Sequence, residues 1–218
     1  MSSIAFFDLD LTLLSCNSAT LWVKRQLREG HISRWDAIKM AGWIGMYQMG
    51  MANIEDAVRK AIRGLEGKSE HDIRVRTEAF WAEEVVGTIR PQARDVVEKH
   101  RKAGDGLVLL TGSSLYLSQC AVKELGLDDF LCTRFAVENG VFTGGVDGAL
   151  CYGPGKLIQA KAYTQAQGVN LKDCIFYTDS YSDLPALEAV GTPIAAHPDP
   201  RLLRHANRHG WPVVNWGE

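Results

Sequence analysis

Two aspartates follow directly after a short apolar segment near the start of the chain. Asp8 and Asp10 come after Ile4–Phe7, a run typical of a buried strand. Carboxylates this close repel each other, and removing them from water adds to the cost. A divalent cation would offset both effects, and carboxylate oxygens are its natural ligands. The pair therefore favours metal-assisted chemistry, with a helix cap or a turn as the structural alternative.

Three further polar clusters lie far from this pair in the sequence. They are Thr111–Ser114, Gly153–Lys156 and Thr178–Asp183. In an open parallel sheet, ligands bind at the carboxyl ends of the strands. Because Asp8, Thr111 and Asp179 each end an apolar run, we expect the fold to bring them together. The four clusters therefore predict one site that handles a phosphate group.

The residue types in these clusters suit phosphoryl transfer. Asp8 can attack phosphorus as a carboxylate nucleophile and form an aspartyl-phosphate. Asp10 can protonate the leaving oxygen and then deprotonate the water that hydrolyses the intermediate. Lys156 can neutralise the phosphoryl group and the aspartate facing it, although a single lysine is usually a solvated surface residue. Thr12 can hydrogen-bond the aspartates or stabilise a local turn. We therefore predict Asp8, Asp10 and Lys156 as the catalytic residues.

The remaining polar residues predict binding rather than reaction. Thr111 and Gly112 stand between a strand and a helix, where a hydroxyl and free N–H groups bind phosphate oxygens. A plain helix N-cap is the alternative there. Asp179 and Asp183 lie four residues apart at a strand-to-helix turn and can bind a hard cation directly or through water. Their structural alternative is capping of a helix over Leu184–Val190.

Apolar runs and helical patterns alternate over most of the chain. Strands are predicted at Ile4–Phe7, Leu107–Leu110, Ile175–Tyr177, Pro193–Ala196 and Pro212–Val214. Helices are predicted between them, for example over Pro91–Lys102 and Ser114–Leu125, while Val137–Val146 is typical of a β-hairpin with an Asn-Gly turn. Such alternation indicates a parallel sheet covered by helices. We therefore predict the α/β class with a doubly wound parallel sheet.

The alternation stops between Ser15 and Gly87. Four helical segments are predicted in this stretch: Ala19–Glu29, Arg34–Met49, Ile54–Arg63 and Ser69–Glu84. A helical block inserted after the first strand is typical of a cap, so we predict a catalytic core of residues 1–14 and 88–218 and a cap of residues 15–87. One predicted cap helix is rich in large side chains, namely Trp35, Trp43, Met46, Tyr47 and Met49. These side chains either form the core of the cap itself or belong to a lid that closes over the leaving group.

With these motifs in this order, the chain resembles the haloacid dehalogenase (HAD) superfamily. Its four motifs are matched by Asp8-Leu9-Asp10-Leu11-Thr12, Thr111-Gly112, Lys156 and Asp179-x-x-x-Asp183. The helical insert resembles the C1 cap of subfamily IB, the phosphoserine-phosphatase-like branch. The resemblance implies a phosphatase in which Mg²⁺ is held by Asp8, Asp179 and the backbone carbonyl of Asp10, with support from Asp183. It also implies that Thr111 and Lys156 bind the phosphoryl group.

Two positions depart from the pattern of that family. Phosphoserine phosphatases carry a glutamate nine residues after the nucleophile, where it reads the amino group of the substrate, and here this position is Asn17. Asn17 is therefore a candidate substrate-binding residue, and its neutral amide implies that phosphoserine is a poor substrate. The residue before the last aspartate of the fourth motif is usually asparagine in those enzymes and is Ser182 here. This change bears on phosphate positioning rather than on the metal site.

Composition limits the partners and the compartment. The 218 residues carry a formal net charge of −2 and no block of lysines and arginines, so we expect neither nucleic acid nor a membrane as a partner. The five cysteines form no Cys-x-x-Cys pair and the N-terminus lacks a signal-like pattern, which predicts a cytoplasmic protein. Cys16 has no obvious base partner, which favours a role in packing over one in catalysis. His205 and His209 favour a solvated helix end over a zinc site.

These observations predict a Mg²⁺-dependent phosphomonoesterase that acts on a small phosphorylated metabolite through an aspartyl-phosphate. Within this class, phosphoserine and histidinol phosphate are the alternative substrates. Outside it, a phospho-accepting regulatory domain would use the same residue types on a similar sheet, but Asp10 and the long helical insert favour turnover. A catalytically inactive binding module is a third alternative. The complete set of Asp8, Asp10, Lys156 and Asp179 speaks against it.

Overall fold

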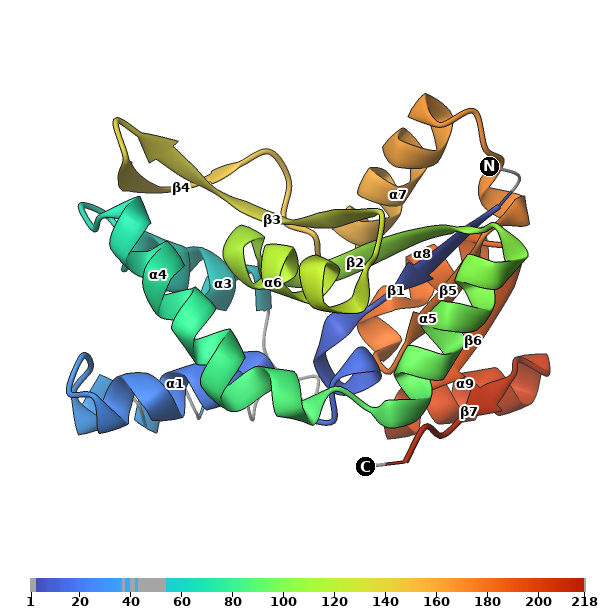
Figure 1. Cartoon of the computed structure of the whole chain (residues 1–218), viewed down its shortest axis with the longest axis horizontal. Coiled ribbons are helices and arrows are strands. Elements are labelled where there is room, and N and C mark those ends of the chain that lie inside the picture. The colour runs from blue at the N-terminus through green and yellow to red at the C-terminus, as the bar shows by residue number, and fades with distance from the viewer. Residues whose placement is uncertain (1–2, 37, 40–41, 43–53, 218) are drawn as a thin grey trace.

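The computed structural model describes residues 3–36, 38–39, 42 and 54–217. Within them, a seven-stranded sheet has the strand order β4-β3-β2-β1-β5-β6-β7 (Figure 1). The strands are β1 (Ile4–Phe7), β2 (Gly106–Ser114), β3 (Asp129–Glu138), β4 (Val141–Asp147), β5 (Ile175–Thr178), β6 (Thr192–Ala196) and β7 (Val213–Val214). Every neighbouring pair is parallel except β3 and β4. Because the order runs outward from β1 in both directions, the predicted doubly wound α/β class is confirmed.

Helices cover both faces of this sheet. Those of the core are α5 (Pro91–Ala103), α6 (Leu115–Leu125), α7 (Pro154–Ala166), α8 (Leu184–Ala189) and α9 (Pro200–His209). On one face, Ala5 and Phe7 share an apolar cluster with residues of α5 and α6. On the other face, Ile4 and Phe6 share a cluster with residues of α7, α8 and α9. A strand buried on both faces is a continuous apolar run, which is why the sequence predicts β1 so clearly.

The second strand is longer than its apolar run. β2 continues past Leu110 to Ser114, so Thr111 and Gly112 belong to the strand and α6 begins only at Leu115. The added length comes from pairing with β3, whose Thr133 is the register partner of Ser114. The register shifts between Leu110 and Ser114, which leaves this end of β2 irregular. The polar residues there therefore lengthen β2 at its carboxyl end, whereas the sequence analysis expected them to open the helix.

The predicted hairpin is confirmed, but it is part of a longer element. β3 starts at Asp129, pairs first in parallel with β2, and then pairs antiparallel with β4. Asn139 and Gly140 form the predicted turn, with φ angles of 52° and 76°. The sequence missed the first half of β3 because that half mixes polar and apolar residues and gains its partners from β2.

The described part of the segment between β1 and α5 consists of helices joined by short turns and loops. It contains α1 (Ser18–Arg28), α3 (Ile54–Arg63) and α4 (Glu70–Phe80), and further helical turns lead to Thr88. Of the predicted helix Arg34–Met49, residues 34–36, 38–39 and 42 are described and helical. Trp43, Met46, Tyr47 and Met49 lie outside the described residues. Trp35 is 74% exposed, so it takes no part in a core of the cap.

Backbone hydrogen bonds join the helical segment to the rest of the molecule at its ends and at the loop between α3 and α4. At its ends, the Ser15 N–H donates to the Thr88 carbonyl (2.8 Å) and Leu14 bridges Ile89. Further out, Phe142 of β4 exchanges hydrogen bonds with the loop between α3 and α4, where Gly67 donates (2.9 Å) and Lys68 accepts (3.0 Å). Figure 1 shows the β3–β4 hairpin reaching over α3 and α4. In the described part of the chain, no helix has the length and apolar character needed to cross a membrane.

Candidate active site

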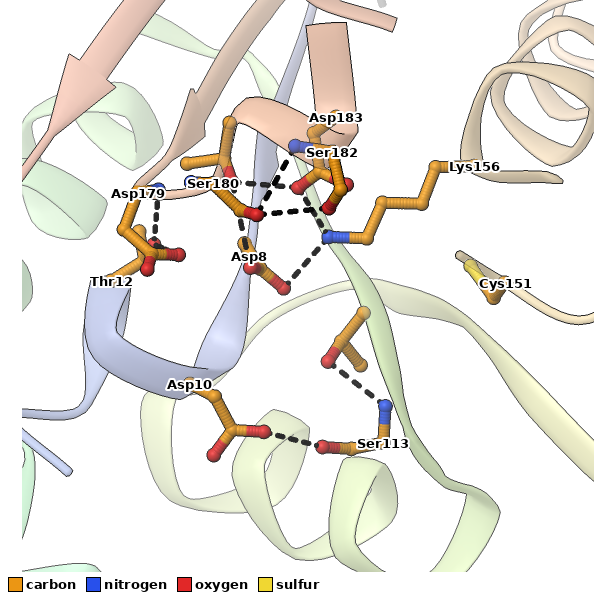
Figure 2. A network of polar contacts seen from close by, with 12 residues as sticks. Asp8, Asp10, Thr12, Ser113, Cys151, Lys156, Asp179, Ser180, Ser182 and Asp183 are labelled. Carbon is orange, nitrogen blue, oxygen red and sulfur yellow. Dashed lines mark hydrogen bonds and ion pairs between the residues drawn. The ribbon is translucent and has the colours of Figure 1, made fainter. Parts of the chain in front are cut away.

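The carboxyl end of β1 places Asp8 in the middle of a polar cluster (Figure 2). Its N–H donates to the Tyr177 carbonyl of β5 (2.9 Å), so strand pairing fixes the backbone position from which the Asp8 side chain extends. The carboxylate lies 3.0 Å from Nζ of Lys156. Burial raises the pKa of Asp8 to about 6, while the attraction of Lys156 opposes the rise. At neutral pH, Asp8 is therefore an ionised but poorly solvated carboxylate, which suits a nucleophile.

A tight turn, Leu9–Leu13, carries the chain from Asp8 toward α1. Asp10 has extended backbone angles within it, and Leu11 takes the left-handed region with a φ of 59°. For a residue other than glycine, such a conformation costs roughly 1–3 kcal/mol. The Leu11 N–H donates to the Cys16 carbonyl (3.0 Å), and this bond holds the turn closed. The strained turn presents the Asp10 side chain beside the end of β1.

Two donors from distant segments orient the Asp10 carboxylate. The Ser18 N–H at the start of α1 donates to one oxygen (2.6 Å), and the Ser113 hydroxyl at the end of β2 donates to the other (3.0 Å). Burial raises the pKa of Asp10, and the hydrogen bonds from Ser18 and Ser113 oppose the rise. A carboxyl group with a raised pKa holds a proton more readily, as a general acid must.

We expect the Ser113→Ala variant to lower kcat by roughly 10- to 100-fold, because a hydrogen bond to a charged group is worth about 1.5–3 kcal/mol. The KM should change little, since Asp10 acts on the leaving oxygen. Steady-state kinetics on a phosphate ester that the protein hydrolyses would measure both constants. Ser114→Ala is the matched control, because the Ser114 hydroxyl accepts from the Leu117 N–H (3.5 Å) and caps α6 instead. Equal kcat losses in the two variants would contradict the role of Ser113.

Thr111 and Gly112 lie at the end of β2 as predicted, next to the strand that carries Asp8. Thr111 is buried, and its hydroxyl oxygen accepts a hydrogen bond from the Ser113 N–H (3.2 Å). That bond leaves the hydroxyl hydrogen free to donate to a phosphate oxygen. Gly112 is exposed. This geometry is compatible with phosphate binding by the end of the strand, although not by a helix N-terminus.

Lys156 is buried between two carboxylates. Its Nζ lies 3.0 Å from Asp8 and 2.7 Å from Asp183, and the residue is 3% exposed. Burial alone would lower the pKa of Lys156, but Asp183 and Asp8 outweigh it and raise that pKa. The Thr178 hydroxyl donates to the same Asp183 oxygen (2.6 Å). Asp183 thus holds Lys156 toward Asp8, and its part in a metal site remains a prediction.

A glycine permits the close approach that brings Lys156 to this position. A Cβ atom on Gly155 would lie 1.9 Å from the Leu150 carbonyl oxygen, so no other residue fits without movement. Gly155 and Pro154 form the first turn of α7, directly before Lys156. The start of the helix therefore depends on this contact.

We expect the Gly155→Ala variant to lose roughly 1–3 kcal/mol of unfolding free energy, as other overpacked sites do. Its kcat/KM should also fall, because the displaced helix start moves Lys156 away from Asp8. Urea denaturation and steady-state kinetics would measure the two effects. Gly87→Ala is the control, since a Cβ atom there meets nothing within 4 Å. Equal stability and activity of the two variants would show that the contact is unimportant.

Asp179 follows β5 and lies beside Asp8, held by Thr12 (Figure 2). The Thr12 hydroxyl accepts from the Asp179 N–H (2.9 Å) and donates to the Asp179 carboxylate (3.3 Å). Thr12 therefore bonds Asp179, and not the pair of Asp8 and Asp10 beside which the sequence analysis placed it. Burial and the charges of Asp8 and Asp183 raise the pKa of Asp179 well above its usual value. Among the described residues, no lysine, arginine or histidine forms an ion pair with it.

The pair of Asp8 and Asp179 fits a hard divalent cation. In the described part of the chain, no three His, Cys, Asp or Glu side chains are arranged to hold a metal ion together. Mg²⁺ does not require such a set, because it is commonly bound by one or two carboxylates and keeps several waters. Burial raises the pKa of both carboxylates, and the charge of Asp8 raises the pKa of Asp179 further, so a nearby positive charge would stabilise their ionised forms. The donor set is therefore suited to Mg²⁺ rather than to zinc.

We expect the metal-free protein to lose stability through Asp8 as the pH rises from about 4 to about 6. The pKa of Asp8 is about 6 in the fold against 3.8 ordinarily, so the folded state binds this proton more tightly than the unfolded state. Its ionisation therefore disfavours the fold. The unfolding free energy of the wild type minus that of Asp8→Asn, measured by urea denaturation in EDTA, should decrease over this range. A difference that is independent of pH would contradict the raised pKa.

Asn17 lies close to Asp10 but has a structural task. It is the N-cap of α1, where its side-chain oxygen accepts from the N–H (2.9 Å) and the hydroxyl (3.0 Å) of Thr20. Because the next residue, Ser18, holds Asp10, this cap helps to place the Asp10 partner. The sequence prediction of Asn17 as a substrate-binding residue did not include this cap.

Two other sequence candidates do not join the site. Cys16 contacts the Thr88 hydroxyl (3.2 Å), and burial raises the pKa of its thiol, so it is no ready nucleophile. His205 and His209 stack on one another with their ring centres 4.0 Å apart on α9. With no third ligand among the described residues, they form no zinc site.

Comparisons with known proteins identify the family to which this chain belongs. A model of the family described as haloacid dehalogenase-like hydrolase matches residues 5–188. Phosphoserine phosphatase SerB1 of Mycobacterium tuberculosis is 30% identical over 98% of this chain and 70% of its own length. The histidinol-phosphatase of Neisseria meningitidis is 26% identical over 99% of this chain and 100% of its own length. A crystal structure of a Bordetella pertussis protein of unknown function matches with a TM-score of 0.90 and 29% identity over 100% of both chains. The chain therefore belongs to the haloacid dehalogenase-like hydrolase family, as its motifs predicted.

Proposed function

We propose that this protein is a Mg²⁺-dependent phosphatase that hydrolyses a small phosphate monoester through an aspartyl-phosphate on Asp8. The observation that carries the proposal is the placement of a buried Asp8 against Lys156, with a separately oriented Asp10 two residues further on. Relatives named as a phosphoserine phosphatase and a histidinol-phosphatase support the same class of reaction.

In the proposed reaction, an Asp8 oxygen attacks phosphorus and the bond from phosphorus to the leaving oxygen breaks. Asp10 donates its proton to that oxygen, then takes a proton from the water that attacks the aspartyl-phosphate and releases phosphate. Lys156 stabilises the negative charge on the phosphoryl group, and Thr111 donates a hydrogen bond to it. Asp8, Asp179 and the Asp10 carbonyl would hold Mg²⁺, which supplies charge neutralisation at the phosphoryl oxygens.

The substrate is a small phosphorylated metabolite, and phosphoserine is expected to be a poor one. A free ammonium group gains about 1.5–3 kcal/mol from a charged hydrogen-bond partner. At the position where phosphoserine phosphatases carry a glutamate, this chain has Asn17, whose side-chain oxygen is engaged by Thr20. The named relatives therefore make phosphoserine and histidinol phosphate the first compounds to compare.

A panel of phosphorylated metabolites assayed with Mg²⁺ and with EDTA tests the proposal. We expect at least one ester to be hydrolysed with Mg²⁺, no hydrolysis in EDTA, and a kcat/KM for phosphoserine below that of the best substrate. Unchanged rates in EDTA would contradict the metal requirement. A phosphorylated protein that forms but persists for many minutes would instead indicate a phospho-accepting regulatory domain.

A further inference from the structure

A second group of cationic side chains lies on α9, apart from the catalytic residues. Arg201, Arg204 and Arg208 are spaced so that they share one face of the helix. All three are exposed. Within the described residues, none of them forms an ion pair with a carboxylate, while six ion pairs between other arginines and carboxylates are present. Their positive charge is therefore available to a ligand.

The three arginines line a pocket together with Tyr181 and His205, and its volume is about 180 Å³. The guanidinium carbon of Arg201 lies 4.4 Å from the centre of the Tyr181 ring, a contact that holds this side chain in place. The Nε2 atom of His205 is buried and has no hydrogen-bond partner. The nearest acidic oxygen recorded for it, on Glu188, lies 3.9 Å away, beyond hydrogen-bond distance. The pocket thus combines three guanidinium groups with a ring nitrogen of His205 that has no hydrogen-bond partner.

The size and charge of the pocket indicate the size and charge of a ligand that would fit it. Pockets for drug-sized molecules occupy roughly 300–1,000 Å³, so this one suits a smaller group. Guanidinium groups match the geometry of tetrahedral oxyanions and form strong charge-assisted hydrogen bonds with them. The chain as a whole has a net charge of −2, so this concentration of positive charge is local. We propose that the pocket binds a small free oxyanion of the phosphate type, at a site distinct from the catalytic one.

The pocket is joined to the loop that carries Asp179. Asp199, which caps α9, accepts a hydrogen bond from the Tyr181 N–H (2.7 Å), and its own N–H donates to the Asp179 carbonyl (2.7 Å). The same carboxylate accepts from the Arg201 N–H (2.7 Å). An anion bound in the pocket beside Arg201 and Tyr181 therefore changes the surroundings of the Tyr181 amide, which serves as a reporter of binding.

Titration of the isotope-labelled protein with sulfate, in EDTA and at constant ionic strength, tests this proposal by two-dimensional NMR. The reporters are the Tyr181 amide and the indole N–H of Trp211, whose ring lies 4.9 Å from that of His205. Trp211→Phe assigns the indole signal. We expect both signals to shift and saturate, and the double variant Arg204→Gln/Arg208→Gln to bind at least about tenfold more weakly, since it loses charge-assisted hydrogen bonds. The control Arg59→Gln/Arg63→Gln removes two exposed arginines from α3 and should bind as the wild type does.

Other outcomes of the titration would overturn the proposal. Shifts confined to the amides of Gly112 and Ser113 would place the anion in the catalytic site. Equal affinity in the wild type and in Arg204→Gln/Arg208→Gln would show that the pocket does not bind it. Should the double variant fail to fold, the single Arg208→Gln variant provides the same comparison. Because no substrate or metal is present, the result is independent of the proposed phosphatase activity.

Discussion

Replacing Asp8 by asparagine is expected to lower the phosphatase rate by roughly 10⁴-fold or more, the scale reached when a nucleophile is removed. A neutral amide is a poor nucleophile, and it is also a weaker ligand for a divalent cation. Initial rates with Mg²⁺ on the best ester of the metabolite panel would measure the loss. Freshly purified protein is needed, because deamidation of the asparagine would regenerate Asp8.

This loss should not result from unfolding. Ionised Asp8 is disfavoured by its burial, so the amide is tolerated in the fold. Thermal denaturation would confirm that the variant is folded, and Asp95→Asn, at an exposed position of α5, is the matched control with unchanged activity. Substantial activity of Asp8→Asn on any phosphate ester would exclude Asp8 as the nucleophile.

The Lys156→Met variant should lose both stability and activity. Removing one partner of a buried ion pair costs about 3–5 kcal/mol, because the remaining charge is left without compensation. Here two carboxylates, Asp8 and Asp183, would lose the same cation. Urea denaturation near neutral pH would measure the decrease in unfolding free energy. The rate should fall as well, since no cation would remain to stabilise the phosphoryl group.

A variant of the same helix separates this effect from a general loss of helix stability. Lys161→Met removes an exposed lysine of α7 and should leave stability and activity nearly unchanged. The stability cost of Lys156→Met should also become smaller below about pH 6, where Asp8 takes up a proton. Equal stability of the two lysine variants at neutral pH would contradict the buried pairing.

The parts of this site that follow from strand ends could be predicted from the sequence. Asp8 and Asp179 each follow an apolar strand, and parallel strands place such residues at one edge of the sheet. β1 was predictable because both of its faces are buried, which leaves an uninterrupted apolar run. Lys156 was found by its place after a glycine-rich turn, although that signal alone did not reveal its burial.

The contacts that orient these groups could not be predicted in the same way. The hydrogen bond from Ser113 to Asp10 joins residues 103 positions apart and depends on the irregular end of β2. It also depends on the left-handed backbone conformation of Leu11, which the residue types in that turn do not predict. The pairing of Asp183 with Lys156 likewise requires α7 to approach through Gly155. Tertiary packing determines the Ser113–Asp10 hydrogen bond, the Leu11 conformation and the Asp183–Lys156 pair. Local sequence patterns cannot predict such packing.

Chemical trapping of the phosphorylated enzyme tests the central proposal most directly. The wild type is quenched with borohydride during turnover of its best substrate with Mg²⁺, and hydride then reduces the acyl-phosphate to an alcohol with release of phosphate. Mass spectrometry of the peptide that contains β1 identifies the modified position. We predict homoserine in place of Asp8, and none in EDTA or in the Asp8→Asn variant. Reduction at another aspartate, or an unmodified Asp8 under conditions of rapid turnover, would contradict an aspartyl-phosphate on Asp8.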